Sequence, residues 1–239
     1  MHSSIRPCSV IAAIVLASAA ALGVDPPDLR INGVSGLIEA VDATWSGSNF
    51  NVRHTLVTGA GQQRASFLLT TNAANDVDPR IAVAPNGDVV VAWWRDLATD
   101  ALVYRKRSFT TGVWGLERAA GIASESNSRP RVVYAGDGPW VAYQIQNAKT
   151  RSVGAQVIDD DPEPIRSIVA TTAYSGDLDT QLNAESKHLW VTWIDNASSV
   201  GYAEYVYEKR LWSVPTQEPF TADSVAAARS RIRSRVLGL

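Results

Sequence analysis

The sequence is poor in cysteine, since its 239 residues include a single one, Cys8. Cys8 lies at the start of an apolar N-terminal segment, and the preceding Ile5-Arg6-Pro7 lacks the small uncharged residues of a lipoprotein cleavage site. The chain beyond that segment has no cysteine at all. Disulfide bonds, thiol nucleophiles and cysteine metal sites are therefore excluded there, and the fold must be held by its core alone.

An excess of charge of one sign is also missing. The chain has 22 basic and 24 acidic residues, a formal net charge of −2, and 46% of its residues are hydrophobic. This content is sufficient for a full core. Because a nucleic-acid-binding surface is strongly basic, we expect no nucleic-acid partner.

A hydrophobic run long enough to span a membrane is missing as well. The apolar segment extends from Val10 to Leu22, follows Arg6 and ends in small residues at Gly23. A transmembrane helix needs about 18 or more apolar residues, whereas this short pattern is typical of a secretory signal peptide. We predict a signal peptide over residues 1–23, a secreted or periplasmic protein, and no membrane span after cleavage; an uncleaved anchor is the alternative.

The sequence does contain an internal repeat. Residues 78–93 predict a strand, a tight turn at Asn86-Gly87 and a second strand that ends in an aromatic residue. Related hairpins begin near residues 28, 129 and 179. Each is followed by a third predicted strand, around residues 52–54, 103–105, 153–155 and 200–202, and by a weaker fourth one, around residues 67–69, 114–116, 165–169 and 212–214.

Four strands per repeat predict the fold. A single four-stranded sheet cannot bury both of its faces, so the repeats must stack on one another, and a ring is the usual closure. We predict an all-β chain with a four-bladed β-propeller over residues 24–222. An open fragment, or a dimer that forms a larger ring, is the alternative.

Residues 223–239 differ from the repeats and predict a short C-terminal helix. Its apolar residues fall on one helical face, and the rest of the segment is basic: Val225, Ile232, Val236 and Leu239 are apolar, and Arg229, Arg231, Arg233 and Arg235 are charged. The helix either packs on the propeller or docks on an acidic partner or on lipid head groups.

The hairpin at residues 78–93, followed by residues 102–108 and by Gly112-Val113-Trp114, resembles the repeats of bacterial sialidase-like (BNR repeat) propellers. In that family an Asp box, Ser-x-Asp-x-Gly-x-x-Trp, forms the turn between the third and fourth strands. Here residues 108–114 are one residue shorter and have threonine in place of the aspartate. The resemblance implies the propeller fold, but the arginine triad, tyrosine–glutamate pair and aspartate of active sialidases have no matching positions.

Positions at the start of the inner strands form a candidate site for an anionic ligand. They are Arg30, Arg80, Arg131 and Gln181. In a closed ring they converge on one mouth of the channel, where guanidinium groups bind carboxylates. Alternatively, each arginine pairs with an aspartate of its own or a neighbouring repeat, because Asp28, Asp78 and Asp179 stand two residues before the first, second and fourth of these positions on the same strand face.

Large aromatic residues recur where the second strands end. They are Trp45, Trp93 or Trp94, Tyr143 and Trp193, with Trp140 and Trp190 nearby. Such residues either stack on sugar rings at the blade edges or form the core between blades. Stacking on sugars requires that they be exposed.

Residue patterns for metals and for catalysis are weak. The acidic run 159–163 lacks the ligand spacing of a calcium loop, and His54 and His188 are isolated in sequence. We expect no metal and no cofactor.

The predicted function is an exported non-catalytic binding module that recognises a glycan, anionic or otherwise, or a protein through one propeller face. The alternative is a sialidase-like glycoside hydrolase with degenerate motifs. Such a hydrolase needs two carboxylates across a cleft.

Overall fold

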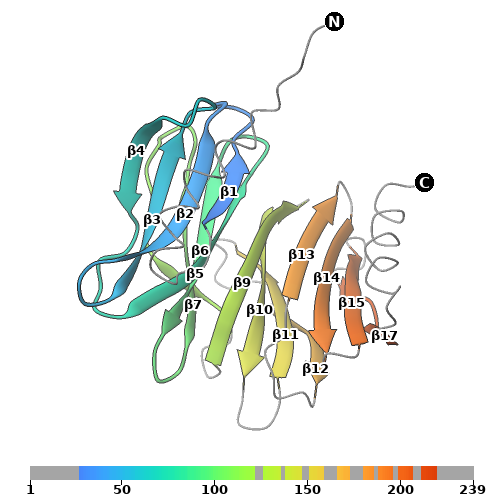
Figure 1. The fold of residues 1–239 in the computed structure, drawn as a ribbon. Coiled ribbons are helices and arrows are strands. Elements are labelled where there is room, and N and C mark those ends of the chain that lie inside the picture. Colours follow the sequence, from blue (N-terminus) through green and yellow to red (C-terminus); the bar gives the residue numbers. More distant parts are fainter. Residues whose placement is uncertain are drawn as a thin grey trace, which may run out of the picture. The chain divides into compact units, whose positions relative to one another are not determined.

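The fold consists of strands and their connections (Figure 1). The structure is a computed structural model that describes residues 27–121, 126–135, 138–146, 151–158, 166–172, 180–185, 188–195, 199–206 and 211–219. Within these ranges no residue is helical, so no described helix could cross a membrane. The predicted signal peptide, the predicted C-terminal helix and the acidic run 159–163 lie outside the described residues.

The strands form four antiparallel sheets, each built from strands consecutive in the chain. Sheet 1 contains β1 (Asp28–Ile31), β2 (Ile38–Trp45), β3 (Phe50–Val57) and β4 (Gln63–Leu68). Sheet 2 contains β5 (Asn75–Val83), β6 (Val89–Asp96), β7 (Ala101–Arg107) and β8 (Arg118–Ala120). Sheet 3 contains β9 (Ser126–Ala135), β10 (Gly138–Gln146), β11 (Arg151–Val157) and β12 (Arg166–Thr172). Sheet 4 contains β13 (Thr180–Glu185), β14 (His188–Asp195) and β15 (Ser199–Val206), with both β16 (Leu211–Trp212) and β17 (Thr216–Pro219) paired to β15.

These sheets confirm the all-β class and the four-stranded repeat. They begin at residues 28, 75, 126 and 180, within three residues of the predicted repeat starts. The fourth strand of the second repeat is the exception. Trp114 makes an isolated bridge to Arg107, and β8 begins four residues later, at Arg118.

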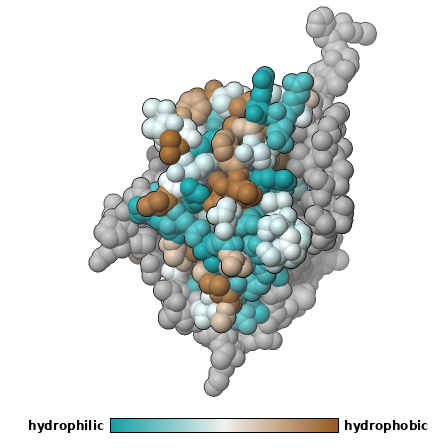
Figure 2. Space-filling model, turned by 90° about the vertical axis from the view of Figure 1, so that its left-hand side faces the viewer, coloured by the Kyte–Doolittle hydropathy of each residue, from teal (hydrophilic) through white to brown (hydrophobic). Residues whose placement is uncertain are grey.

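The described residues divide into two compact units, with the boundary between Ala120 and Gly121. Unit 1 contains sheets 1 and 2, and unit 2 contains sheets 3 and 4. Seen from the side of β4, the surface carries small apolar groups separated by polar side chains (Figure 2).

The core of unit 1 lies between its two sheets. Side chains alternate along a strand, and Val89, Val91 and Trp93 of β6 share the face of sheet 2 that packs on Val41 and Val52 of sheet 1. Trp93 is fully buried. The β-branched and aromatic residues that predicted these strands therefore also form the contact between the sheets.

The core of unit 2 is richer in large aromatic rings. Trp140 of sheet 3 packs against Tyr205 of sheet 4, with ring centroids 4.6 Å apart. Trp193 lies across Gly201 on the neighbouring strand, where an added Cβ would come within 2.1 Å of the indole. Sheet 3 repeats the arrangement with Tyr143 and Gly154, at 2.6 Å. Both glycines are needed because a ring occupies the space of their side chains.

Two turns of sheet 2 are joined by one carboxylate. Gly87 has φ +87° in the predicted Asn-Gly turn, a conformation that favours glycine. The Asp-box-like segment 108–114 connects β7 towards β8, as the resemblance implies, and the N–H of Gly112 donates to the carbonyl of Ser108. Asp88 accepts the N–H of Phe109 at 2.7 Å. The first hairpin thus supplies an acidic group that holds the second turn.

Candidate functional site

Arg30 and Arg80 both form ion pairs within their own strands. Arg30 Nη1 lies 2.6 Å from Asp28 Oδ1, and Arg80 pairs with Asp78. These are the pairs expected if the arginines serve their own repeats. Asp28 Oδ2 also accepts the N–H of Ile81, which connects β1 to β5 within unit 1.

The two arginines stand at different levels of their hairpins. The pair nearest the turn is Ile31–Ile38 in sheet 1 and Val83–Val89 in sheet 2. Along its strand, Arg30 lies one residue before Ile31 of that pair. Arg80 lies three residues before Val83 of the pair in sheet 2. Equal spacing in the sequence therefore does not give equal height in the sheet.

Arg80, Arg131 and Gln181 do occupy matching positions. Their partners on the second strand are Ala92, Ala142 and Thr192, each of which directly precedes a buried aromatic residue. Arg131 donates to the carbonyl of Pro130 at 2.8 Å. The backbone of Gln181 lies in β13, and its side chain is outside the described part of the structure.

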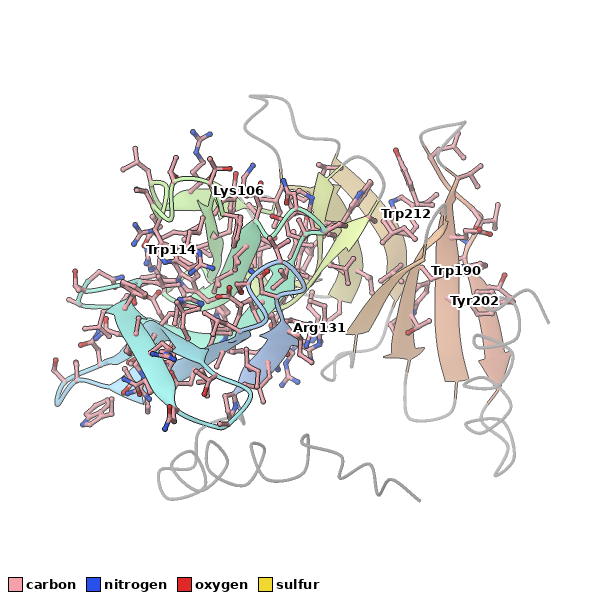
Figure 3. All side chains as sticks on the ribbon, turned by 90° about the horizontal axis from the view of Figure 1, so that it is seen from above. Lys106, Trp114, Arg131, Trp190, Tyr202 and Trp212 are labelled. Atoms are coloured by element: carbon pink, nitrogen blue, oxygen red, sulfur yellow. The ribbon has the colours of Figure 1, made fainter. Side chains whose placement is uncertain are left out.

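The aromatic positions separate into core and surface. Trp93, Tyr143, Trp193 and Trp140 are at most 1% exposed and belong to the core. Trp94 and Trp190 are half-buried, and Trp190 lies beside Tyr202 with centroids 6.3 Å apart (Figure 3). Trp45 differs from all of these because 48% of it is exposed.

Trp45 is held firmly at the end of β2. Its partner across the hairpin is Phe50, and the two rings meet edge to face with centroids 5.0 Å apart. Asn49 in the turn donates to the carbonyls of Asn72 and Ala74 at 2.8 and 2.9 Å. These bonds fix the aromatic pair relative to the start of β5.

An ion cluster lies next to that connection, at the same end of unit 1. Asp76 is fully buried and accepts hydrogen bonds from Asn72 (2.7 Å), Trp93 Nε1 (3.0 Å) and Arg95 Nε (2.7 Å). Arg95 also binds both carboxylate oxygens of Glu117, at 2.6 and 2.9 Å. Burial lowers the pKa of Arg95, but hydrogen bonds and charges from Glu117 and Asp76 outweigh burial and raise this pKa above its ordinary value.

We call Trp45, Phe50, Asp76, Arg95 and Glu117 the rim site. Through the bonds of Asn49 to Asn72 and of Asn72 to Asp76, an exposed indole is linked to a partly exposed carboxylate and guanidinium, whose side chains are 37% and 16% exposed. The face of an indole can cover the C–H groups of a sugar ring, while the charged groups bond hydroxyls. Asp76, Arg95 and Glu117 were not predicted as site residues. Arg95 stands two residues after Trp93, a spacing that placed it on the same strand face.

A second polar cluster is buried between sheets 1 and 2. Glu39 bonds His54 Nε2 through one oxygen and Arg107 Nη2 through the other, both at 2.6 Å. Asn32 donates to the same carboxylate at 2.9 Å. Burial raises the pKa of Glu39, but the bonds from His54 and Asn32 and the charge of Arg107 lower it below its ordinary value.

His54 is therefore not isolated, contrary to the interpretation from sequence. Its partner Glu39 lies on the neighbouring strand, and strand register cannot be inferred from histidine spacing. Trp114 (labelled in Figure 3) contacts both the His54 ring, with centroids 5.2 Å apart, and the Arg107 guanidinium, at 5.6 Å. His54 is 0% and Glu39 1% exposed, so solvent does not reach the cluster. It joins the sheets and is not a ligand site.

Metal-ligating groups do not gather in the described ranges. No set of three or more histidine, aspartate or glutamate side chains there is placed to hold an ion.

Comparison with known proteins shows likeness in structure but not in sequence. No family model matches the chain, and no curated protein does. A protein of unknown function from Dyadobacter fermentans matches with a TM-score of 0.56 at 12% identity, over 72% of this chain and 49% of that one. An exo-β-1,3-galactanase from Phanerochaete chrysosporium matches with a TM-score of 0.53 at 8% identity, over 82% of this chain and 50% of that one.

The matches also include trans-sialidases. One is an intramolecular trans-sialidase from Ruminococcus gnavus, with a TM-score of 0.38 at 12% identity over 78% of this chain and 40% of that one. The fold assignment depends on the first two structures, and the galactanase is a β-propeller hydrolase. The chain thus has a propeller-like, all-β fold and spans about half the length of those two structures.

Proposed function

We propose that the protein is an exported, non-catalytic binding module that holds a carbohydrate at the rim site. In this proposal the four sheets are blades of one propeller that ends in the C-terminal helix. The observation that carries it is Trp45, which is 48% exposed and in edge-to-face contact with Phe50, whereas Trp93 and Trp193, two residues further from the turn after the second strand, are buried.

The charge of the rim site favours a neutral sugar over an anionic one. Two carboxylates, Asp76 and Glu117, share the single guanidinium of Arg95. The cluster therefore carries one negative charge in excess, which repels a carboxylated ligand. Arg30 and Arg80, which could attract such a ligand, are each paired with an aspartate.

The hydrogen bonds of the same carboxylates support a non-catalytic role. A retaining or inverting glycosidase needs one carboxyl group to protonate the leaving oxygen and a second one free to attack or to activate water. Both oxygens of Asp76 accept bonds from Arg95, and so do both oxygens of Glu117.

The contribution of Trp45 can be estimated from its exposed surface. Covering about 80 Å² of the indole at ~25 cal/mol/Å² gives about 2 kcal/mol. This free energy corresponds to about a 30-fold change in the dissociation constant. Replacing Trp45 should therefore weaken binding by roughly that factor without unfolding the protein.

The test uses residues 24–239 on an array of neutral and sialylated glycans that includes β-1,3-galactotriose, followed by titration calorimetry of any retained glycan. Trp45→Ala should weaken binding about 30-fold, and Trp45→Phe should weaken it less. The matched control is Phe109→Ala, since Phe109 is 38% exposed and lies by the β7–β8 connection at the opposite end of sheet 2. Equal loss in Trp45→Ala and Phe109→Ala, or no retained glycan, would overturn the proposal. Turnover of any glycan on the array would reject the non-catalytic part.

A further inference from the structure

The rim site has an aromatic part on sheet 1 and a charged part on sheet 2, namely Trp45 with Phe50, and Asp76 with Arg95 and Glu117. Side chains alternate along a strand, so Trp45 shares the face of Val41, which packs on sheet 2. Arg95 shares the face of Val91, which packs on sheet 1. The two parts therefore stand on facing surfaces. Packed sheets lie about 10 Å apart, which is the length of about two sugar rings.

The β4–β5 connection, residues 69–74, lies at the same end of unit 1 as the β2–β3 turn and ties the two parts together (Figure 1). At the aromatic part, the Asn49 amide donates to the carbonyls of Asn72 and Ala74, at 2.8 and 2.9 Å. At the charged part, the Asn72 side chain donates to the buried Asp76 at 2.7 Å. The connection is thus fixed at both parts, and their separation is fixed with it.

The exposed residues of this connection are small. Thr71 and Ala73 are exposed, whereas Leu69, its one large apolar residue, is buried. The Thr71 hydroxyl can both donate to and accept from a sugar hydroxyl. The connection therefore forms a low polar strip between the indole of the aromatic part and the Glu117 carboxylate, and a large side chain at position 73 would obstruct it.

We propose that the rim site binds a chain of at least two neutral sugars, with one ring on Trp45 and the next over residues 71–73 beside Glu117. This inference rests on the proposed carbohydrate binding and adds the length of the ligand to it. One ring cannot contact both parts, because it covers only about half of the distance between the sheets. The chain runs over turns at the ends of the sheets, whereas the stacking of blades covers sheet faces.

The test is titration calorimetry of residues 24–239 with galactose, glucose, mannose and xylose, each as the mono-, di- and trisaccharide. The disaccharide of the bound sugar should bind about 10-fold more tightly than its monosaccharide, because it adds hydrogen bonds to a charged group. The third ring should add little. Glu117→Ala should remove the gain from the second ring and leave the monosaccharide unchanged, and Glu117→Gln should retain part of the gain. Trp45→Ala should weaken both sugars.

A steric variant tests the path of the chain without changing a charge. Ala73→Leu places a large side chain over the connection, so it should weaken the disaccharide and leave the monosaccharide unchanged. The matched control is Ala60→Leu, since Ala60 is also exposed and lies in the β3–β4 turn, at the opposite end of sheet 1. This control should change neither affinity. Thermal melting monitors the fold of every variant.

The two proposals fail in different ways. Binding that is lost in Trp45→Ala but is equally tight for mono- and disaccharide would overturn the two-ring site and leave carbohydrate binding at Trp45 in place. A gain from the second ring that persists in both Glu117→Ala and Ala73→Leu would also overturn the two-ring site. No binding of any of these sugars would overturn both proposals.

Discussion

The two units solve the same packing problem with different chemistry. In unit 1 a valine and tryptophan core is supplemented by the buried Glu39, which bonds His54 within sheet 1 and Arg107 of sheet 2. In unit 2 aromatic rings fill the contact, and one of them, Trp193, lies across a glycine of the next strand. The repeat therefore specifies strands and turns, while the side chains that join neighbouring sheets vary from one pair to the next.

The difference predicts unequal sensitivity to substitution. A buried ion pair adds little net stability over an apolar contact, but removing one member leaves an uncompensated charge out of water. Aromatic packing over glycine responds instead to added volume. Unit 1 should be sensitive to loss of charge, and unit 2 to gain of a methyl group.

The largest effect is expected for Glu39→Gln. It leaves Arg107 buried without a counter-ion, which should lower the free energy of unfolding by about 3–5 kcal/mol. Urea unfolding followed by tryptophan fluorescence measures the loss. Asp96→Asn, at an exposed position at the end of β6, is the control. A loss under ~1 kcal/mol for Glu39→Gln would show that the cluster does not hold the sheets together.

A smaller effect is expected for Gly201→Ala in unit 2. The new methyl group would come within 2.1 Å of the Trp193 ring, so the ring must move, at a cost of about 1–3 kcal/mol. Gly59→Ala is the matched control, because nothing lies within 4 Å of a Cβ at that position. If the two variants were equally stable in thermal melting, the packing described for Trp193 would be incorrect.

The pH dependence of unfolding should separate the two kinds of contact. The folded-state pKa of Glu39 lies below its ordinary value of 4.5. The stability that Glu39 contributes is therefore present above about pH 4.5 and is lost as the pH falls through its folded-state pKa. Melting temperatures measured from neutral to acid pH should fall less steeply for Glu39→Gln than for the unchanged protein. Parallel curves for the two proteins would contradict this account.

The smallest effect is expected for Arg30→Ala. Its ion pair with Asp28 lies at the surface, with the arginine side chain 47% exposed, so the loss should be below ~1 kcal/mol. The same variant, together with Arg80→Ala, tests the predicted anion site. Weaker binding of a carboxylated ligand by both variants, with the fold intact, would support that site; unchanged binding would assign both arginines to their aspartates.

Much of the fold follows from the sequence because it is encoded locally. The Asn86-Gly87 turn and the valines on either side of it define a hairpin, and repetition at intervals of about 50 residues predicts four sheets. It was harder to predict which residues of different sheets lie at the same distance from the turn of their hairpin. Arg30 and Arg80 have the same sequence spacing, but Arg30 lies one residue and Arg80 three residues from the pair nearest the turn of its hairpin.

The candidate site was predicted in part. The aromatic positions were identified, but whether each ring is buried depends on the neighbouring sheet, so the exposure of Trp45 could not be derived from its strand. The partners of Arg95 and His54 come from other strands, whose register the sequence does not reveal. The ion pairs Arg30–Asp28 and Arg80–Asp78 were anticipated because their members are two residues apart in one strand.

The most direct test of carbohydrate binding at the rim site is hydrogen exchange on residues 24–239, with and without a saturating glycan selected on the array. The account predicts slower exchange in peptides that cover residues 45–50 and 72–76, which carry the aromatic pair and its anchor to β5. Peptides over residues 106–114, at the other end of sheet 2, should be unchanged. Protection at residues 106–114 with none at residues 45–50 would contradict the account.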